Sequence, residues 1–188
     1  MIEHFSLEDV SRKADALVSR MESEFGKPDL VVAIANGGLY VGDLIAKATD
    51  AKLKWISIGK DLDLGNLYKN KSLPHQMARV VHGYRFLTRA PKIKDISEMP
   101  ESAELILLID DTVHTGRTFQ LAYAALKEKF PDALIVTAAI NSVRGKGVDI
   151  VLHDRKRIWF PWSKHSPEYA EYRKRLAELG LADIKDDA

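Results

Sequence analysis

LILLIDDTVHTGRT, residues 105–118, is the stretch that decides the fold of this 188-residue chain. Five consecutive apolar residues, 105–109, are typical of a central parallel strand that is buried on both faces. Asp110 and Asp111 follow them, and apolar residues then recur at helical spacing over 119–129. The pattern predicts a buried strand that ends in two acids, then a turn of small residues that opens a helix.

This predicted strand end has the features of an anion site. Ligands of open α/β sheets bind at the carboxyl ends of strands, and the first N–H groups of the next helix suit a phosphate. Gly116 allows close backbone approach to an anion, while Thr115 and Thr118 add hydroxyl donors. Asp110 and Asp111 would be a costly strand end for structure alone, because adjacent carboxylates raise each other's pKa.

The segment resembles the phosphoribosyl pyrophosphate (PRPP) signature of the type I phosphoribosyltransferases, which is an apolar strand, two acids, two variable residues and a Thr-Gly-x-Thr-like turn. The resemblance implies that Asp110 and Asp111 contact the ribose hydroxyls and hold Mg²⁺, directly or through hydroxyls or water. It also implies that the turn binds the 5′-phosphate of PRPP. The PRPP-binding residues of this turn would be Thr112, Val113, His114, Thr115, Gly116, Arg117 and Thr118.

His114 departs from the pattern of the 6-oxopurine branch, in which an Asp at this point of the turn faces N7 of the base. An imidazole can accept a proton or donate a hydrogen bond, so His114 is a candidate catalytic residue beside Asp110 and Asp111. The alternative is a loop residue that faces solvent. We expect the substitution to change which base is preferred.

A second element of the resemblance is Asn36-Gly37-Gly38, which follows the apolar run 30–35. In phosphoribosyltransferases the loop after the first strand usually carries a basic residue and two glycines, whose backbone amides hold the pyrophosphate. The resemblance therefore implies that Asn36, Gly37 and Gly38 bind PRPP, although Asn36 stands where Lys or Arg is common. A plain strand-to-helix turn is the alternative.

A third element, Lys146 followed by RIWFPW at 157–162, looks like the hood of the 6-oxopurine phosphoribosyltransferases. In that hood a Lys binds the purine O6 and an aromatic residue stacks on the base. The resemblance implies a base-binding set of Lys146, Arg157, Ile158 and Trp159, in which Arg157 occupies the stacking position and can itself stack. Hydrophobic packing is the alternative for Trp159 and the favoured interpretation for Trp162.

The rest of the chain alternates between helical and strand patterns. Ser6 and Asp9 resemble a capping box before a helix that ends near Phe25. Together the patterns predict an α/β fold of the type I phosphoribosyltransferase kind, a mostly parallel twisted sheet flanked by helices, in one domain over 1–188. The hood is expected at about 141–165 plus the C-terminal helix. Further helices are expected at 39–49 and 167–179, strands at 30–35, 53–58, 84–88, 134–140 and 148–152, a lid at 59–81, and a charged connector at 91–102.

Composition limits the classes of partner. The 28 Lys and Arg against 27 Asp and Glu leave a net charge of +1, which gives no argument for a nucleic acid or an acidic membrane as partner. No apolar run approaches the roughly 20 residues of a membrane helix. The first residues lack the features of a signal peptide, so we expect a cytoplasmic protein. With no cysteine, disulfides and thiolate metal sites are excluded.

The resemblance implies an Mg²⁺-dependent enzyme of nucleotide salvage. It would transfer the 5-phosphoribosyl group from PRPP to a nucleobase, most simply a 6-oxopurine, and release pyrophosphate. Two alternatives stay open: a PRPP- or nucleotide-binding regulator without turnover, and a transferase for a non-purine base. The family resemblance also implies a homo-oligomer, either a dimer or a tetramer.

Overall fold

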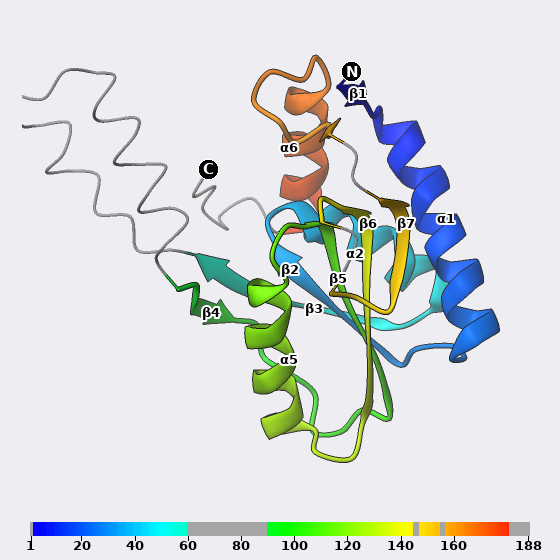
Figure 1. The fold of residues 1–188 in the computed structure, drawn as a ribbon, viewed down its shortest axis with the longest axis vertical. Helices are drawn as coiled ribbons and strands as arrows, with labels where there is room; N and C mark the ends of the chain where they lie inside the picture. The colour runs from blue at the N-terminus through cyan, green and yellow to red at the C-terminus, as the bar shows by residue number, and fades with distance from the viewer. Residues whose placement is uncertain (1, 60–89, 145–146, 155–156, 181–188) are drawn as a thin grey trace, which may run out of the picture.

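The computed structural model describes residues 2–59, 90–144, 147–154 and 157–180, which form a central sheet flanked by helices (Figure 1). The sheet has the strand order β4-β3-β2-β5-β6-β7, and all neighbours are parallel except β3 and β4. A separate two-stranded sheet pairs β1 with β8. In chain order the elements are β1 (Glu3–His4), α1 (Leu7–Glu24), β2 (Leu30–Ala35), α2 (Gly37–Thr49), β3 (Lys52–Gly59), β4 (Lys92–Ile96), β5 (Leu105–Val113), α5 (Arg117–Lys129), β6 (Leu134–Ser142), β7 (Ile150–Asp154), β8 (Ile158–Trp159) and α6 (Tyr169–Glu178).

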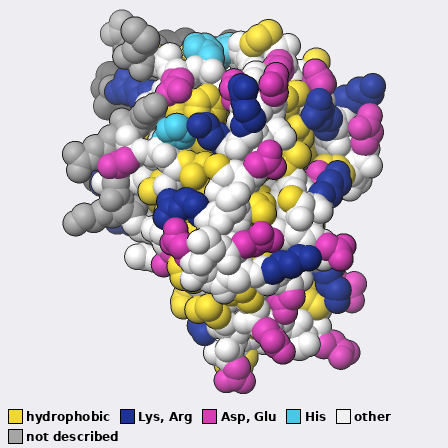
Figure 2. Space-filling model, turned by 90° about the vertical axis from the view of Figure 1, so that its right-hand side faces the viewer, with side chains coloured by type: hydrophobic (Ala, Val, Ile, Leu, Met, Phe, Trp, Pro, Cys, Tyr) yellow, Lys and Arg dark blue, Asp and Glu magenta, His cyan; other side chains and the backbone are white. Residues whose placement is uncertain are grey.

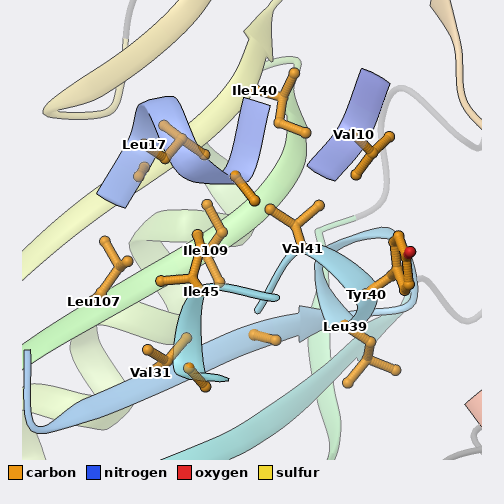
Figure 3. Packing of buried hydrophobic residues seen from close by; sticks show 14 of the residues in the cluster. Val10, Leu17, Val31, Leu39, Tyr40, Val41, Ile45, Leu107, Ile109 and Ile140 are labelled. Atoms are coloured by element: carbon orange, nitrogen blue, oxygen red, sulfur yellow. The ribbon is translucent and has the colours of Figure 1, made fainter. Parts of the chain in front are cut away.

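Helices cover both faces of the sheet, as the alternating sequence pattern predicts. One core contains α1, α2 and α6, and Figure 3 shows Leu17 of α1 and Ile45 of α2 in it beside Ile109 of β5. The other core contains α5, which contributes Phe119 and Leu126. A fully buried Leu, Ile or Phe side chain stabilises a fold by about 1.5–3 kcal/mol. The two cores therefore hold β5 firmly from both sides, and the α/β prediction is confirmed.

The capping box predicted at the start of α1 is confirmed. The Ser6 hydroxyl accepts a hydrogen bond from the Asp9 N–H at 3.0 Å, and the Asp9 carboxylate accepts one from the Ser6 N–H at 2.9 Å. The backbone N–H and hydroxyl of Ser6, together with Arg12, lower the pKa of Asp9 to about 2. The box satisfies two N–H groups that the helix itself leaves without partners.

The expectation of a charged connector over 91–102 is wrong, because Lys92–Ile96 forms strand β4 and pairs antiparallel with β3. Ile93 lies between two lysines, and it is the one residue of the strand that is partly buried. An edge strand tolerates charge on its exposed side, and lysines there discourage pairing with other chains. The many charged residues of this segment are therefore compatible with a strand at the edge of the sheet.

Two other boundaries differ from expectation. Strand β5 does not stop at the two acids, as predicted, but continues two residues beyond them to Val113. Helix α2 begins at Gly37, two residues before the apolar helical pattern starts. The strand expected at 84–88 lies outside the described residues, as does the lid segment beyond Gly59.

The molecular surface carries both signs of charge. On the side shown in Figure 2, basic and acidic side chains are interspersed. Helix α1 supplies pairs of this kind, such as Arg20 with Glu24 at 2.9 Å, and Arg20 also donates to the carbonyl of Val151 in β7. Over the described part of the chain, no helix is both long enough and apolar enough to cross a membrane.

The capping box gives a stability prediction. Ser6→Ala removes the side-chain acceptor at the N-cap of α1, and we expect the free energy of unfolding to fall by about 1 kcal/mol. Urea denaturation at neutral pH measures this loss. Ser19→Ala in the same helix is the matched control, because Ser19 is exposed and bonds back to the carbonyl of Asp15, so its loss should change stability by less than about 0.5 kcal/mol. Equal losses in the two variants would contradict a capping role for Ser6.

Candidate active site

A cavity of about 260 Å³ opens at the carboxyl end of β5, on the face of the sheet that α5 covers. Among the described residues, its wall contains one carboxylate, Asp110, and two arginines, Arg117 and Arg144. The cavity is thus positioned where ligands of α/β sheets bind, and its basic groups favour an anion. The described residues that line it are Pro91, Asp110, Thr112, Val113, His114, Thr115, Gly116, Arg117, Thr118, Phe119, Val143 and Arg144.

The turn between β5 and α5 forms the anion-binding end of this cavity. Gly116 is the N-cap of α5 and has φ of 73°, a left-handed conformation that residues with a Cβ rarely adopt. The first N–H groups of α5 have no partner inside the helix and carry its positive dipole end. Thr115 and Thr118 add hydroxyls beside them, and Arg117 is exposed at the same turn. A phosphate group fits this chemistry.

Asp110 is the acid that borders the cavity. Its side chain accepts a hydrogen bond from the backbone N–H of Asp111 at 2.8 Å. Burial, and then the negative charge of Asp111, raise the pKa of Asp110 well above its ordinary value. The carboxylate form is therefore costly in the free protein, and groups that donate hydrogen bonds or carry positive charge in the cavity would stabilise it.

Asp111 lies on the opposite face of the sheet, among α2 and the hood. Its Oδ2 atom accepts a hydrogen bond from the indole N–H of Trp162 at 2.5 Å. Burial raises the pKa of Asp111, and the Trp162 hydrogen bond acts in the other direction. The predicted pair of acids thus lies on one strand but faces two different environments.

The two glycines at the start of α2 are packed against these acids. A Cβ atom at Gly37 would collide with the carboxylate of Asp111, and one at Gly38 would lie 2.7 Å from the carbonyl oxygen of Ile109. Real Cβ atoms essentially never approach that closely. The missing side chains are therefore needed for α2 to begin beside β5, a requirement of the fold that is independent of any bound pyrophosphate.

The predicted site residues fall into four groups. Asp110 and the turn residues 112–118 line the cavity together, whereas Asn36, Gly37, Gly38 and Asp111 lie at the start of α2 and beside it. Lys146 lies outside the described residues. The remaining base-binding candidates, Arg157, Ile158 and Trp159, do not line the cavity as far as the described residues define it.

The hood residues have different surroundings. Ile158 packs against the core that contains α1 and α2. Trp159 is 40% exposed and meets the ring of His4 edge-on, with 4.9 Å between ring centroids. Trp162 packs as the sequence favoured, but it also donates to Asp111. Sequence reasoning missed this bond and missed Arg144; the only signal for the first was that a buried indole N–H needs a partner.

Asp110 and Asp111 are the acids that could hold a metal together with a ligand. Within the described ranges, no three His, Asp or Glu side chains form a metal-binding group. Mg²⁺ is commonly bound by one or two carboxylates together with substrate phosphates and water. Asp110 beside the anion cavity fits a metal that arrives with a phosphorylated substrate.

Comparisons with known proteins give one family. The family described as phosphoribosyl transferase domain matches residues 6–165. No match was found among curated protein sequences. Among solved structures, xanthine-guanine-hypoxanthine phosphoribosyltransferase from Helicobacter pylori has a TM-score of 0.67 at 18% identity, over 93% of this chain and 99% of that one.

Two further solved structures have the same fold. Purine phosphoribosyltransferase from Pyrococcus horikoshii has a TM-score of 0.63 at 19% identity, over 86% of this chain and 93% of that one. A hypothetical protein from Neisseria gonorrhoeae with bound ppGpp has a TM-score of 0.62 at 18% identity, over 96% of this chain and 98% of that one. Structural similarity at such low sequence identity shows that this chain shares the fold of these proteins.

The raised pKa of Asp110 gives a prediction about stability and pH. Because the ionised form is costlier in the folded chain than in the unfolded one, the penalty is complete above the raised pKa and disappears below the unfolded value of about 3.9. We expect Asp110→Asn to raise the free energy of unfolding at neutral pH, on the order of 1 kcal/mol. The gain should shrink as the pH falls to about 4.

Urea denaturation at the two pH values measures this difference. Asp132→Asn, at an exposed position in the turn before β6, is the matched control and should give no comparable gain. A gain from Asp110→Asn that does not depend on pH would show that burial of charge is not its cause.

Proposed function

This chain belongs to the phosphoribosyl transferase domain family, and from that premise we propose that it transfers the 5-phosphoribosyl group of PRPP to a 6-oxopurine base and releases pyrophosphate. The family match covers residues 6–165 and supports the general reaction. The purine is the finer part of the proposal. It draws support from the hood resemblance and from the oxopurine and purine enzymes among the structural neighbours.

The observation that carries the proposal is the cavity at the end of β5. Its described lining combines the N-terminus of α5, three threonine hydroxyls and two arginines, which suit a phosphate, with one carboxylate that suits a hydroxyl. PRPP carries both groups, because its 5′-phosphate is attached to a ribose that has free hydroxyls. We assign the turn from Thr112 to Thr118 to the phosphate, and Asp110 and Asp111 to the ribose.

The chemistry is displacement at the anomeric carbon. A ring nitrogen of the base forms the new bond while the bond from the anomeric carbon to the pyrophosphate oxygen breaks, and positive charge develops on the ribose ring. The carboxylates of Asp110 and Asp111 stabilise this charge electrostatically. We assign Asn36, Gly37 and Gly38 to the departing pyrophosphate, because the N-terminus of α2 presents N–H groups beside Asp111.

The base is assigned to the region between His114 and the hood. His114 is exposed at the rim of the cavity, where its imidazole can exchange a proton or a hydrogen bond with the base. Lys146, Arg157, Ile158 and Trp159 are the hood residues assigned to the base by resemblance. The expected lid at 59–81 belongs to the same proposal, since excluding water would prevent hydrolysis of PRPP.

Mg²⁺ is the proposed cofactor. Asp110 and Asp111 would hold it, directly or through ribose hydroxyls and water, and the ion would neutralise charge on the departing pyrophosphate. The proposal includes a cytoplasmic homo-oligomer, a dimer or tetramer, with neither nucleic acid nor a membrane as partner.

A pyrophosphate-release assay tests the function. With PRPP and Mg²⁺, we expect release with guanine, hypoxanthine or xanthine, and not with adenine, uracil or orotate. Thr118→Val removes a hydroxyl from the phosphate turn while keeping its shape, so the KM for PRPP should rise roughly tenfold. Thr118→Ser, which retains the hydroxyl, should restore most of the lost affinity.

The other outcomes have definite meanings. Release with uracil or orotate alone would replace the purine with a different base. Binding of PRPP without release for any base would indicate a regulator that uses the fold for nucleotide binding. An unchanged KM in Thr118→Val would contradict the placement of the 5′-phosphate.

A further inference from the structure

Trp162 lies in the hood, 51 residues beyond Asp111 in the sequence, yet its indole N–H donates to Oδ2 of Asp111 at 2.5 Å. None of the roles assigned above includes it. We infer that Trp162 is a positioning residue, which orients the Asp111 carboxylate toward the ribose of PRPP without itself touching the reacting atoms. The inference rests on the proposed function, because that function assigns Asp111 to the ribose.

The Asp111 carboxylate is confined from two sides. Trp162 bonds to Oδ2, and the backbone of Gly37 lies so close that a Cβ atom there would collide with the same oxygen. An ionised carboxylate has about four acceptor positions. The hydrogen bond from Trp162 to Oδ2, together with hydrogen bonds from the backbone N–H and the hydroxyl of Thr112, limits the orientations of the group and leaves an acceptor position for a ribose hydroxyl.

The indole is itself held by aromatic packing. Trp162 stacks on Phe160 with 4.8 Å between centroids and an interplanar angle of 6°. Tyr172 of α6 lies 5.5 Å away on another side, and its side chain is fully buried. Tyr40 of α2 approaches edge-on at 6.4 Å. Rings packed in this way have few alternative positions, so the N–H points at Asp111 consistently.

This arrangement suits positioning better than direct catalysis. An indole N–H donates a hydrogen bond but does not give up its proton, so Trp162 cannot act as a general acid or general base. Its effect must pass through the carboxylate that it contacts. Misplacing a group that contacts the reacting sugar slows a reaction even when the group is still present.

A double-mutant experiment tests the inference. Trp162→Phe keeps an aromatic ring over Phe160 and removes the N–H, so we expect kcat/KM for PRPP to fall roughly tenfold. The KM for the base should not change. In the Asp111→Asn background the same substitution should add little, because a residue that acts through Asp111 has no separate effect once that carboxylate is lost.

Trp55→Phe is the matched control for loss of an indole. Trp55 is on β3 and packs against the core that contains α1 and α2. It should lower stability in thermal melts as Trp162→Phe does, while kcat/KM for PRPP stays at the wild-type value. The comparison separates loss of packing from loss of positioning.

A spectroscopic readout makes the test independent of turnover. The indole ¹H–¹⁵N signal of Trp162 is identified by its absence in Trp162→Phe. Asp111→Asn should shift this signal, and Asp132→Asn, at the exposed position in the turn before β6, should leave it in place. If no base supports pyrophosphate release, the proposed function fails while this measurement still reports on the contact.

Three results would overturn the inference. The first is an indole signal that does not respond to Asp111→Asn. The second is a loss in the double variant equal to the product of the two single losses, because Trp162 would then act independently of Asp111. The third is a rise in the KM for the base, which would make Trp162 a direct contact of the base.

Discussion

The alternation of side chains along β5 is the constraint on which the site depends. Successive residues of a strand point to opposite faces, and β5 is buried on both. Its last apolar residues divide between the two cores, with Leu108 in the α5 core and Ile109 in the other. Two adjacent acids that continue this strand must separate in the same way. Asp110 reaches the cavity beside α5, and Asp111 reaches α2 and the hood.

Each carboxylate imposes a different requirement on its surroundings. A buried charge without partners is expensive, and hydrogen bonds to it recover part of the cost. On the α2 side, the protein supplies a partner in Trp162 and leaves room by placing Gly37 where a side chain would collide. On the α5 side, Asp110 receives one backbone hydrogen bond and otherwise borders an open cavity. The protein therefore orients Asp111 itself, whereas a bound ligand must supply the remaining hydrogen-bond partners of Asp110.

The sequence predicted the parts of this arrangement that depend on neighbours along the chain. The apolar run of β5, the turn at Gly116 and the capping box at Ser6 are local patterns, and each formed near its expected place. The β1–β8 pair was not predicted, since its strands have two residues each and are far apart in the sequence. The contact between Trp162 and Asp111 is equally non-local. Local periodicity carries no information about such pairs.

The separation of the acids also relates the site to the shape of its proposed substrate. PRPP has a phosphate at one end, a pyrophosphate at the other, and a ribose between them. In the proposed function, the turn at Gly116 and the start of α2 take these two anionic ends on opposite faces of the sheet. The ribose then lies across the end of β5, where two adjacent acids on the strand contact it from both faces. A single acid, or two acids spaced by one residue, would leave one side of the sugar without a carboxylate.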